Sequence, residues 1–313
     1  MKLLWNNFPR AKLASLLELN PWARAGGEIT RGDTGTTAQI GLGIIDQEEL
    51  VIARRAAAAA RQASGLRAWN DWANAMLALE KRIGGDAAGL WCELATTDFA
   101  GHAFRKRCDF ADFLFPGPAD FSNARFTVDA WFSAARFAGI VDFSRASFDR
   151  DAFFEGAEYR DAASFDRTRW TRSAQFRLSK FQSDASFRDA RFDHDAWFVG
   201  SRFGGALSFV ATRFAGEAGL GGCECRGGCD FSLVLFKDNA GLEQAHFHGP
   251  ARFEDTRFER KAWFRQARFD AELSFARAQF SGAIDFTGVS CAANPRVFDE
   301  LAARLKGQAI LTS

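Results

Sequence analysis

A large apolar residue recurs along this chain at alternating steps of five and six residues. One series runs from residue 99 to residue 286 in steps of 11, and a second runs from 104 to 280, five residues behind the first. Of these 35 positions 30 are Phe, and the exceptions are Tyr159, Trp170, Leu220, Cys225 and Leu242. A period that stays unbroken over most of the chain predicts a repeat architecture rather than an ordinary mixed core.

The composition reflects this repeat. The chain has 313 residues with 34 Phe and 1 Tyr, and only four Phe lie outside the two series. The position two residues before each large residue is mostly small, as in Ala124, Ala152 and Ala190. Because residues two apart on a strand point to the same side, each short segment should send one small and one large side chain inward. The charged, Ser and Gly residues between them should face water.

A helical alternative fits less well. An 11-residue period is compatible with a right-handed coiled coil. That seam would be lined by Phe and interrupted by many Gly and Ser, which contradicts helix propensity. Strands of three or four residues, each followed by a bend, explain the pattern better.

The unit Ala-x-Phe, as in Ala124-Arg125-Phe126 and Ala190-Arg191-Phe192, resembles the pentapeptide-repeat family. The closest likeness is to the Phe-centred subgroup with alternating five- and six-residue steps. Over residues 96–290 the resemblance implies an all-β solenoid, a right-handed quadrilateral β-helix with one unit per side. Four units then give a 22-residue coil, with about nine coils in all and a bulge or wider corner at each six-residue step. A flat 11-residue coil is the competing geometry, but two facing Phe rings would leave no room for its bends.

Three regions are expected. Residues 1–95 should form an irregular arm (20–43) and two helices (46–62 and 66–83), which either cap the first coil or bind a partner. Residues 96–290 form the solenoid. Residues 291–313 should contain a capping helix, because Asn294 and Pro295 provide an N-cap and a first-turn proline before an apolar stripe that ends at Gly307.

The bulk charge and hydropathy exclude several classes of protein. The net charge is +1, and residues 96–290 carry 26 basic and 27 acidic side chains, so nothing drives the chain toward nucleic acid. No apolar run is long enough to predict a transmembrane segment, and the first seven residues turn polar too soon for a signal-peptide core. The six Cys are expected to be free thiols in a cytoplasmic protein.

The cysteines Cys223, Cys225 and Cys229 are the strongest candidates for a metal or redox site. All three occupy inward slots of the repeat, so core packing is the favoured interpretation. The four His lie in no catalytic or ligand motif, and neither a cofactor nor a metal is expected. The residues predicted to build the core include Phe126, Phe187, Phe192, Phe253 and Phe264.

Two outward columns are candidate interaction surfaces. Arg169, Arg191 and Arg213 recur once in each expected coil and should share one face. They require either acidic neighbours or a bound anion, and Glu155, Asp166, Asp189 and Asp193 are available. Trp131, Phe153, Trp197 and Trp263 are separated by multiples of the coil length and should share another face. Exposed aromatics on one face favour a docking or dimer surface, although they can also simply cover the strands beneath.

The sequence therefore predicts a non-catalytic scaffold that binds a protein partner, with a homodimer as a further possibility. Nucleic-acid mimicry directed at a DNA topoisomerase, which the family resemblance also suggests, is disfavoured by the balanced charge.

Overall fold

The structure is a computed structural model that describes residues 18–20, 47–83, 88–294, 296–305 and 310–311. The chain forms two compact units. One comprises residues 1–99 with 114–120, and the other comprises residues 100–113 with 121–313.

The first unit contains the helices α2 (Gln47–Ala63), α3 (Gly65–Ile83) and α4 (Ala88–Ala95), and the strands β1 (Thr97–Asp98), β4 (Leu114–Phe115) and β5 (Ala119–Asp120). The two predicted helices are confirmed to within a residue. Helix α4 was not predicted, because its eight residues are too few to show a helical period. Residue 46, the predicted start of the first helix, and nearly all of the predicted arm (20–43) lie outside the described residues.

Within this unit, Trp69 joins α3 to β4. Its buried indole donates a hydrogen bond of 2.8 Å to the carbonyl of Leu114, and its ring meets Phe115 edge-on at 5.4 Å. Asn70 accepts a hydrogen bond of 2.9 Å from the backbone amide of Leu114. The two expected roles of these helices, capping the first coil or binding a partner, both stay predictions.

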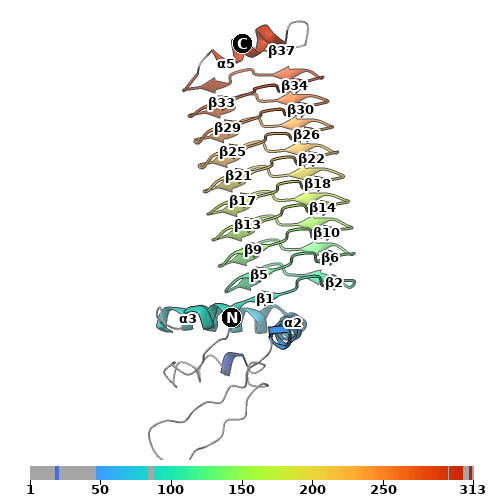
Figure 1. The fold of residues 1–313 in the computed structure, drawn as a ribbon, viewed down its shortest axis with the longest axis vertical. Helices are drawn as coiled ribbons and strands as arrows, with labels where there is room; N and C mark the ends of the chain where they lie inside the picture. Colours follow the sequence, from blue (N-terminus) through green and yellow to red (C-terminus); the bar gives the residue numbers. More distant parts are fainter. Residues whose placement is uncertain (1–17, 21–46, 84–87, 295, 306–309, 312–313) are drawn as a thin grey trace, which may run out of the picture. The chain divides into compact units, whose positions relative to one another are not determined.

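The second unit is built from two-residue strands in four parallel sheets, which are called sheets A to D below. Figure 1 shows these strands stacked coil upon coil. Its part of sheet A contains β9 (Val141–Asp142), β13 (Ala163–Ser164), β17 (Ala185–Ser186), β21 (Leu207–Ser208), β25 (Cys229–Asp230), β29 (Ala251–Arg252) and β33 (Leu273–Ser274). Sheet B contains β2 (Ala103–Phe104), β6 (Arg125–Phe126), β10 (Ser147–Phe148), β14 (Arg169–Trp170), β18 (Arg191–Phe192), β22 (Arg213–Phe214), β26 (Leu235–Phe236), β30 (Arg257–Phe258) and β34 (Gln279–Phe280).

Sheet C contains β3 (Cys108–Asp109), β7 (Ala130–Trp131), β11 (Ala152–Phe153), β15 (Ala174–Gln175), β19 (Ala196–Trp197), β23 (Ala218–Gly219), β27 (Ala240–Gly241), β31 (Ala262–Trp263), β35 (Ile284–Asp285) and β37 (Ile310–Leu311). The part of sheet D in this unit contains β8 (Arg136–Phe137), β12 (Glu158–Tyr159), β16 (Lys180–Phe181), β20 (Arg202–Phe203), β24 (Glu224–Cys225), β28 (His246–Phe247), β32 (Arg268–Phe269) and β36 (Ser290–Cys291).

The register of these sheets confirms the 22-residue coil. Ala174 pairs with Ala196 in sheet C, and Phe192 pairs with Phe214 in sheet B. Each coil therefore has four sides, and the 11-residue coil is ruled out. Sheet B alone has nine strands, which agrees with the expected solenoid of about nine coils.

The interior consists of aromatic rings stacked in columns. Phe187 lies parallel to Phe165 at 4.8 Å and to Phe209 at 5.0 Å, and it meets Phe176 edge-on at 5.4 Å. The five residues predicted to build the core, Phe126, Phe187, Phe192, Phe253 and Phe264, are all fully buried. Offset parallel and edge-on contacts of this kind stabilise aromatic cores beyond the area that they bury.

The two kinds of corner differ in backbone conformation. In every five-residue step, the second residue after the first-series position has a positive φ, from Gly101 (67°) through Ala134 (54°) to Gly288 (67°). The six-residue steps turn without such a residue in the described chain. The sequence analysis expected a bulge or wider corner at each six-residue step. The structure instead places the left-handed backbone conformation in the five-residue steps.

The last part of the chain contains α5 (Val297–Arg304). Phe298 of this helix packs 5.0 Å from the Phe286 ring, so the predicted helix covers rings of the terminal coil. Its N-cap is Arg296 rather than Asn294, because the Asn294 side chain accepts from the Arg296 amide (3.2 Å) and forms a turn before the helix. The short strand β37 follows and pairs with β35, which the sequence did not predict.

No helix in the described ranges combines the length and the apolar character needed to cross a membrane.

Candidate interaction surfaces

Each strand of the solenoid turns one side chain inward and one outward, so the four sheets present four distinct faces. The outward strand positions of sheets A, B and D carry no Phe, Tyr or Trp in the second unit. Sheet C carries all four predicted aromatics, Trp131, Phe153, Trp197 and Trp263, on β7, β11, β19 and β31. The prediction that they share one face is confirmed.

The four aromatics do not form a continuous strip. Trp131 and Phe153 lie on adjacent strands and stack with ring centroids 4.1 Å apart and an interplanar angle of 15°. Gln175 separates this pair from Trp197, and two glycines separate Trp197 from Trp263. All four side chains are half-buried. Only the Trp131–Phe153 pair therefore forms an aromatic surface larger than one ring.

Trp197 has a different environment. A Cβ atom placed on Gly219 would lie 2.5 Å from the Trp197 ring, so the indole lies over the bare backbone of that glycine. The guanidinium of Arg177 lies over the ring, 5.1 Å from its centroid. For Trp197 the structure therefore supports the surface-cover interpretation.

The basic column lies on sheet B, where Arg169, Arg191 and Arg213 come from consecutive strands. Asp193 bridges the first two, at 3.1 Å from Arg169 and 2.5 Å from Arg191. Of the four acidic residues named as available partners, it is the one that pairs with this column. The other three pair elsewhere: Asp166 with Ser186 and the Arg188 amide, Glu155 with Arg177, and Asp189 with Arg167.

Arg213 differs from the two arginines before it. The position equivalent to Asp193 one coil later is Ala215, which offers no carboxylate. The Nε of Arg213 is buried and has no hydrogen-bond partner among the described residues. The prediction of an internally paired column therefore holds for Arg169 and Arg191 and is wrong for Arg213.

The three clustered cysteines are buried, as the packing interpretation predicted. Cys223, Cys225 and Cys229 are each 2% exposed. The Cys223 thiol donates to the carbonyl of Phe198 (3.0 Å), just as the Ser201 hydroxyl donates to Phe176 one coil earlier. Burial raises the pKa of Cys223, whereas the pKa of Cys225 is raised first by its hydrogen bond with Cys229 and then by burial.

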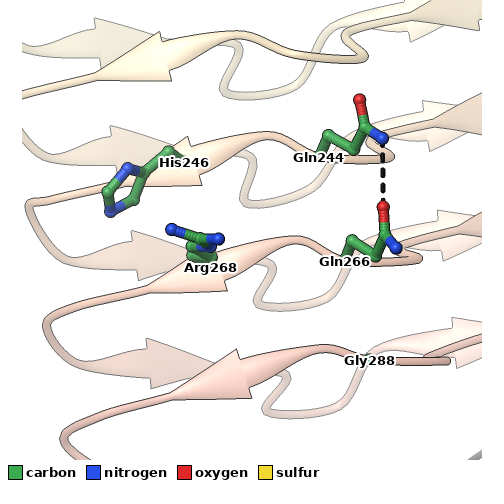
Figure 2. A pocket seen from close by; sticks show the side chains of 5 residues that line it. All are labelled: Gln244, His246, Gln266, Arg268 and Gly288. Carbon is green, nitrogen blue, oxygen red and sulfur yellow. Dashed lines mark hydrogen bonds between the residues drawn. The ribbon is translucent and has the colours of Figure 1, made fainter.

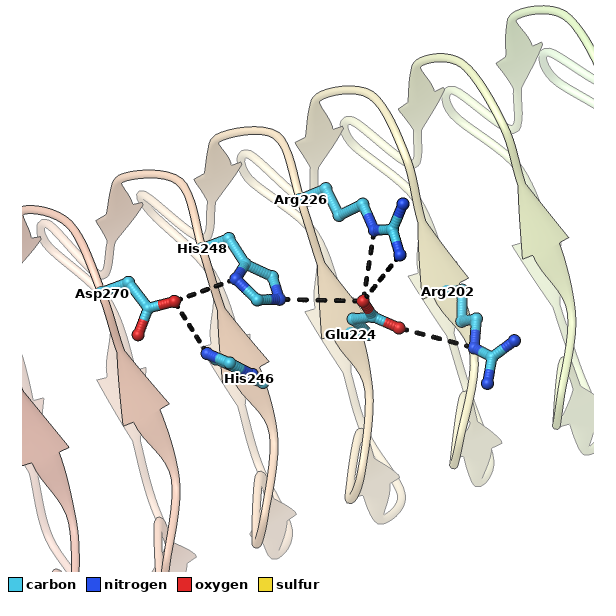
Figure 3. A network of polar contacts seen from close by, with 6 residues as sticks. All are labelled: Arg202, Glu224, Arg226, His246, His248 and Asp270. Atoms are coloured by element: carbon cyan, nitrogen blue, oxygen red, sulfur yellow. Dashed lines mark hydrogen bonds and ion pairs between the residues drawn. The ribbon is translucent and has the colours of Figure 1, made fainter.

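Sheet D also carries a polar cluster that the sequence did not predict. His246 and His248 flank the inward Phe247 on β28, and Asp270 follows β32 one coil later (Figure 3). One carboxylate oxygen of Asp270 lies 2.8 Å from His246 Nε2 and 2.9 Å from His248 Nδ1. The pKa of Asp270 is lowered, chiefly by its hydrogen bond with His246.

Figure 2 shows a surface pocket beside this cluster, lined by Gln244, His246, Gln266, Arg268 and Gly288. The Gln244 amide donates a hydrogen bond of 3.0 Å to Gln266 across the two coils. The lining is polar, whereas sites for small organic ligands are mostly apolar. The pocket therefore does not resemble a site for such a ligand.

The comparisons with known proteins agree with this architecture. The family model described as pentapeptide repeats (9 copies) matches residues 110–158, 165–213 and 242–290. A search of curated proteins and a search of solved structures each found no match. The repeat model and the four-sided solenoid with its 22-residue register together show that the chain belongs to the pentapeptide-repeat family.

Proposed function

We propose that this chain is a non-catalytic scaffold that binds a protein partner through sheet C, with Trp131 and Phe153 as the anchor. The fold is consistent with an interaction role. The observation that carries the proposal is the stacked aromatic pair at outward strand positions of sheet C, which among the described strands of the second unit is the one sheet with outward aromatics.

The surroundings of the pair resemble the anatomy of a protein interface. Asp109 and Gln175 occupy the equivalent positions on the strands before and after it, so an apolar centre has polar residues on both sides. Interfaces typically combine buried aromatic residues at the centre with a polar rim. The Trp131 and Phe153 rings stack on each other and do not cover a glycine. The surface-cover interpretation therefore suits this pair less than it suits Trp197.

The compartment that we propose is the cytoplasm. All five cysteines with described side chains are free, which suits a reducing environment.

The double substitution Trp131→Ser and Phe153→Ser tests the proposal. Affinity capture from the native cell identifies the partner, and calorimetry with purified proteins then measures the dissociation constant. Loss of an interface anchor of about 2 kcal/mol or more weakens binding by roughly 30-fold or more. Trp263→Ser is the matched control, because Trp263 is outward on the same sheet but isolated.

Unchanged affinity in the double variant would refute the role of the pair. Sedimentation equilibrium distinguishes one particular partner, a second copy of this chain. If the partner is a second copy, the wild type self-associates and the double variant does so more weakly, whereas Trp263→Ser behaves as the wild type.

A further inference from the structure

The cluster of His246, His248 and Asp270 carries an inference that is independent of the proposed function. We propose that these three side chains form a site for a divalent transition-metal ion of the zinc, nickel and copper type. Two imidazoles and one carboxylate are a donor set that such ions prefer.

The fold brings the donors together. Phe247 points into the core, so its neighbours both point outward: His246 on β28 and His248 directly after it (Figure 3). Phe247 pairs with Phe269 in the next coil, which places Asp270 beside His248 across the sheet. The stacking of the two coils therefore presents three donors on one small area of surface.

The distances suit a shared ion. One ligand atom from each of His246, His248 and Asp270 lies within 4.8 Å of the other two. One Asp270 carboxylate oxygen lies 2.8 Å from His246 Nε2 and 2.9 Å from His248 Nδ1. With metal–ligand bonds of about 2.0–2.1 Å, neighbouring ligands lie about 2.9 Å apart around an octahedral ion and about 3.4 Å apart around a tetrahedral one. An ion therefore fits after small side-chain movements.

A fourth residue supports the histidine geometry. Glu224 Oε1 lies 3.7 Å from His248 Nε2, the ring nitrogen that faces away from Asp270. Arg226 (3.1 Å) and Arg202 (3.5 Å) hold this carboxylate in place, as Figure 3 shows. A carboxylate next to the ring nitrogen that does not bind the metal fixes the orientation of the imidazole and raises the basicity of the nitrogen that does. Glu224 is therefore a positioning residue for the site.

The exposure of the three donors and the positive charge beside them indicate which ions the site should bind. The side chains of His246, His248 and Asp270 are 32%, 36% and 49% exposed, so an ion can enter from solvent and keep bound water. Arg268 pairs in register with His246, and its positive charge disfavours ions that are held mainly by electrostatic attraction. Ca²⁺ and Mg²⁺ prefer oxygen ligands and bind through charge, so this site should discriminate against them.

Equilibrium dialysis of chelator-treated full-length protein against Zn²⁺ tests the proposal. We expect His248→Gln and Asp270→Asn to bind one equivalent less than the wild type. Glu224→Gln should weaken that equivalent by about 10- to 100-fold. His194→Gln is the matched control, because His194 lies 3.5 Å from Asp195 without a second histidine, and it should bind as the wild type does.

Thermal unfolding gives a second readout. Because the donors come from adjacent coils, saturating Zn²⁺ should raise the Tm of the wild type by at least about 2 °C and leave that of His248→Gln unchanged, while Ca²⁺ should affect neither. The exposed donors should be replaceable without unfolding, which equal Tm values in chelator would verify. Equal zinc stoichiometry in the wild type, His248→Gln and Asp270→Asn would overturn the proposal.

Discussion

At the scale of single residues, two slots of the ring columns contain an aromatic side chain that carries a polar group. Trp170 donates its indole N–H to the Thr168 hydroxyl at 2.9 Å, and that hydroxyl donates in turn to the Phe165 carbonyl. Tyr159 is fully buried between Phe137 and Phe181, and its hydroxyl has no partner among the described residues. The same kind of slot therefore holds a satisfied polar group at Trp170 on sheet B and an unsatisfied one at Tyr159 on sheet D.

Tyr159→Phe should stabilise the protein by about 1 kcal/mol, because it removes an unsatisfied buried hydroxyl and keeps the ring stack. Urea denaturation at pH 7 measures the change. Trp170→Phe is the comparison and should destabilise, since it deletes a hydrogen-bonded group and leaves a void. A less stable Tyr159→Phe variant would mean that the hydroxyl has a partner.

The same tyrosine predicts a pH dependence. Burial raises the pKa of Tyr159 well above its ordinary value of about 10. Above pH 10 the unfolded chain therefore releases a proton that the folded chain retains, and the stability falls as the pH rises. The difference in unfolding free energy between Tyr159→Phe and the wild type should widen from pH 9 to pH 11. A constant difference would contradict this account.

At the scale of elements, each coil combines stacked rings with strained corners. Phe187→Ala should cost about 3–5 kcal/mol, because it opens a cavity among five neighbouring rings. Phe187→Leu should cost clearly less, since Leu220 and Leu242 fill first-series slots of the same kind. Chemical denaturation of both variants tests this, and an unchanged midpoint for Phe187→Ala would be incompatible with a buried ring.

The corners give a second prediction at this scale. Ala134 and Gly156 occupy the same corner in successive coils, with φ of 54° and 65°. An L-residue pays a steric penalty in this region, and nothing lies within 4 Å of a Cβ built on Gly156. Gly156→Ala should therefore cost about 1 kcal/mol, and Ala134→Gly should gain about 0.5 kcal/mol. Denaturation curves for the two variants should shift in opposite directions.

At the scale of the molecule, the ring columns are interrupted in one place. The family model leaves out residues 214–241, where Leu220 and Cys225 replace rings and glycines are frequent. The strands there keep their register, since Arg202 pairs with Glu224 and Glu224 with His246. Backbone pairing therefore continues through a segment whose core is less aromatic.

This segment should open before the rest of the solenoid, because repeat arrays are held together by neighbour contacts. Cys223, Cys225 and Cys229 should resist alkylation in the native protein. They should become reactive at a lower urea concentration than the one that changes the fluorescence of the buried tryptophans. Mass mapping of labelled peptides measures this order, and coincident transitions would indicate a single cooperative unit.

The sequence determined the 11-residue period of the solenoid and the inward or outward faces of Phe187, Trp131 and Arg169, while the family resemblance implied the 22-residue coil. Inward and outward positions alternate in strict order along each strand, so burial fixes them locally. The tertiary structure alone decided which side chains meet. Asp193 contacts two arginines and Asp270 contacts two histidines, whereas the Nε of Arg213 has no hydrogen-bond partner among the described residues. Apart from the Asp193–Arg191 pair, those contacts join residues that lie about a full coil apart in the chain. They depend on side-chain conformation and on the residue at single outward positions such as Ala215, which the period of inward hydrophobic residues does not specify.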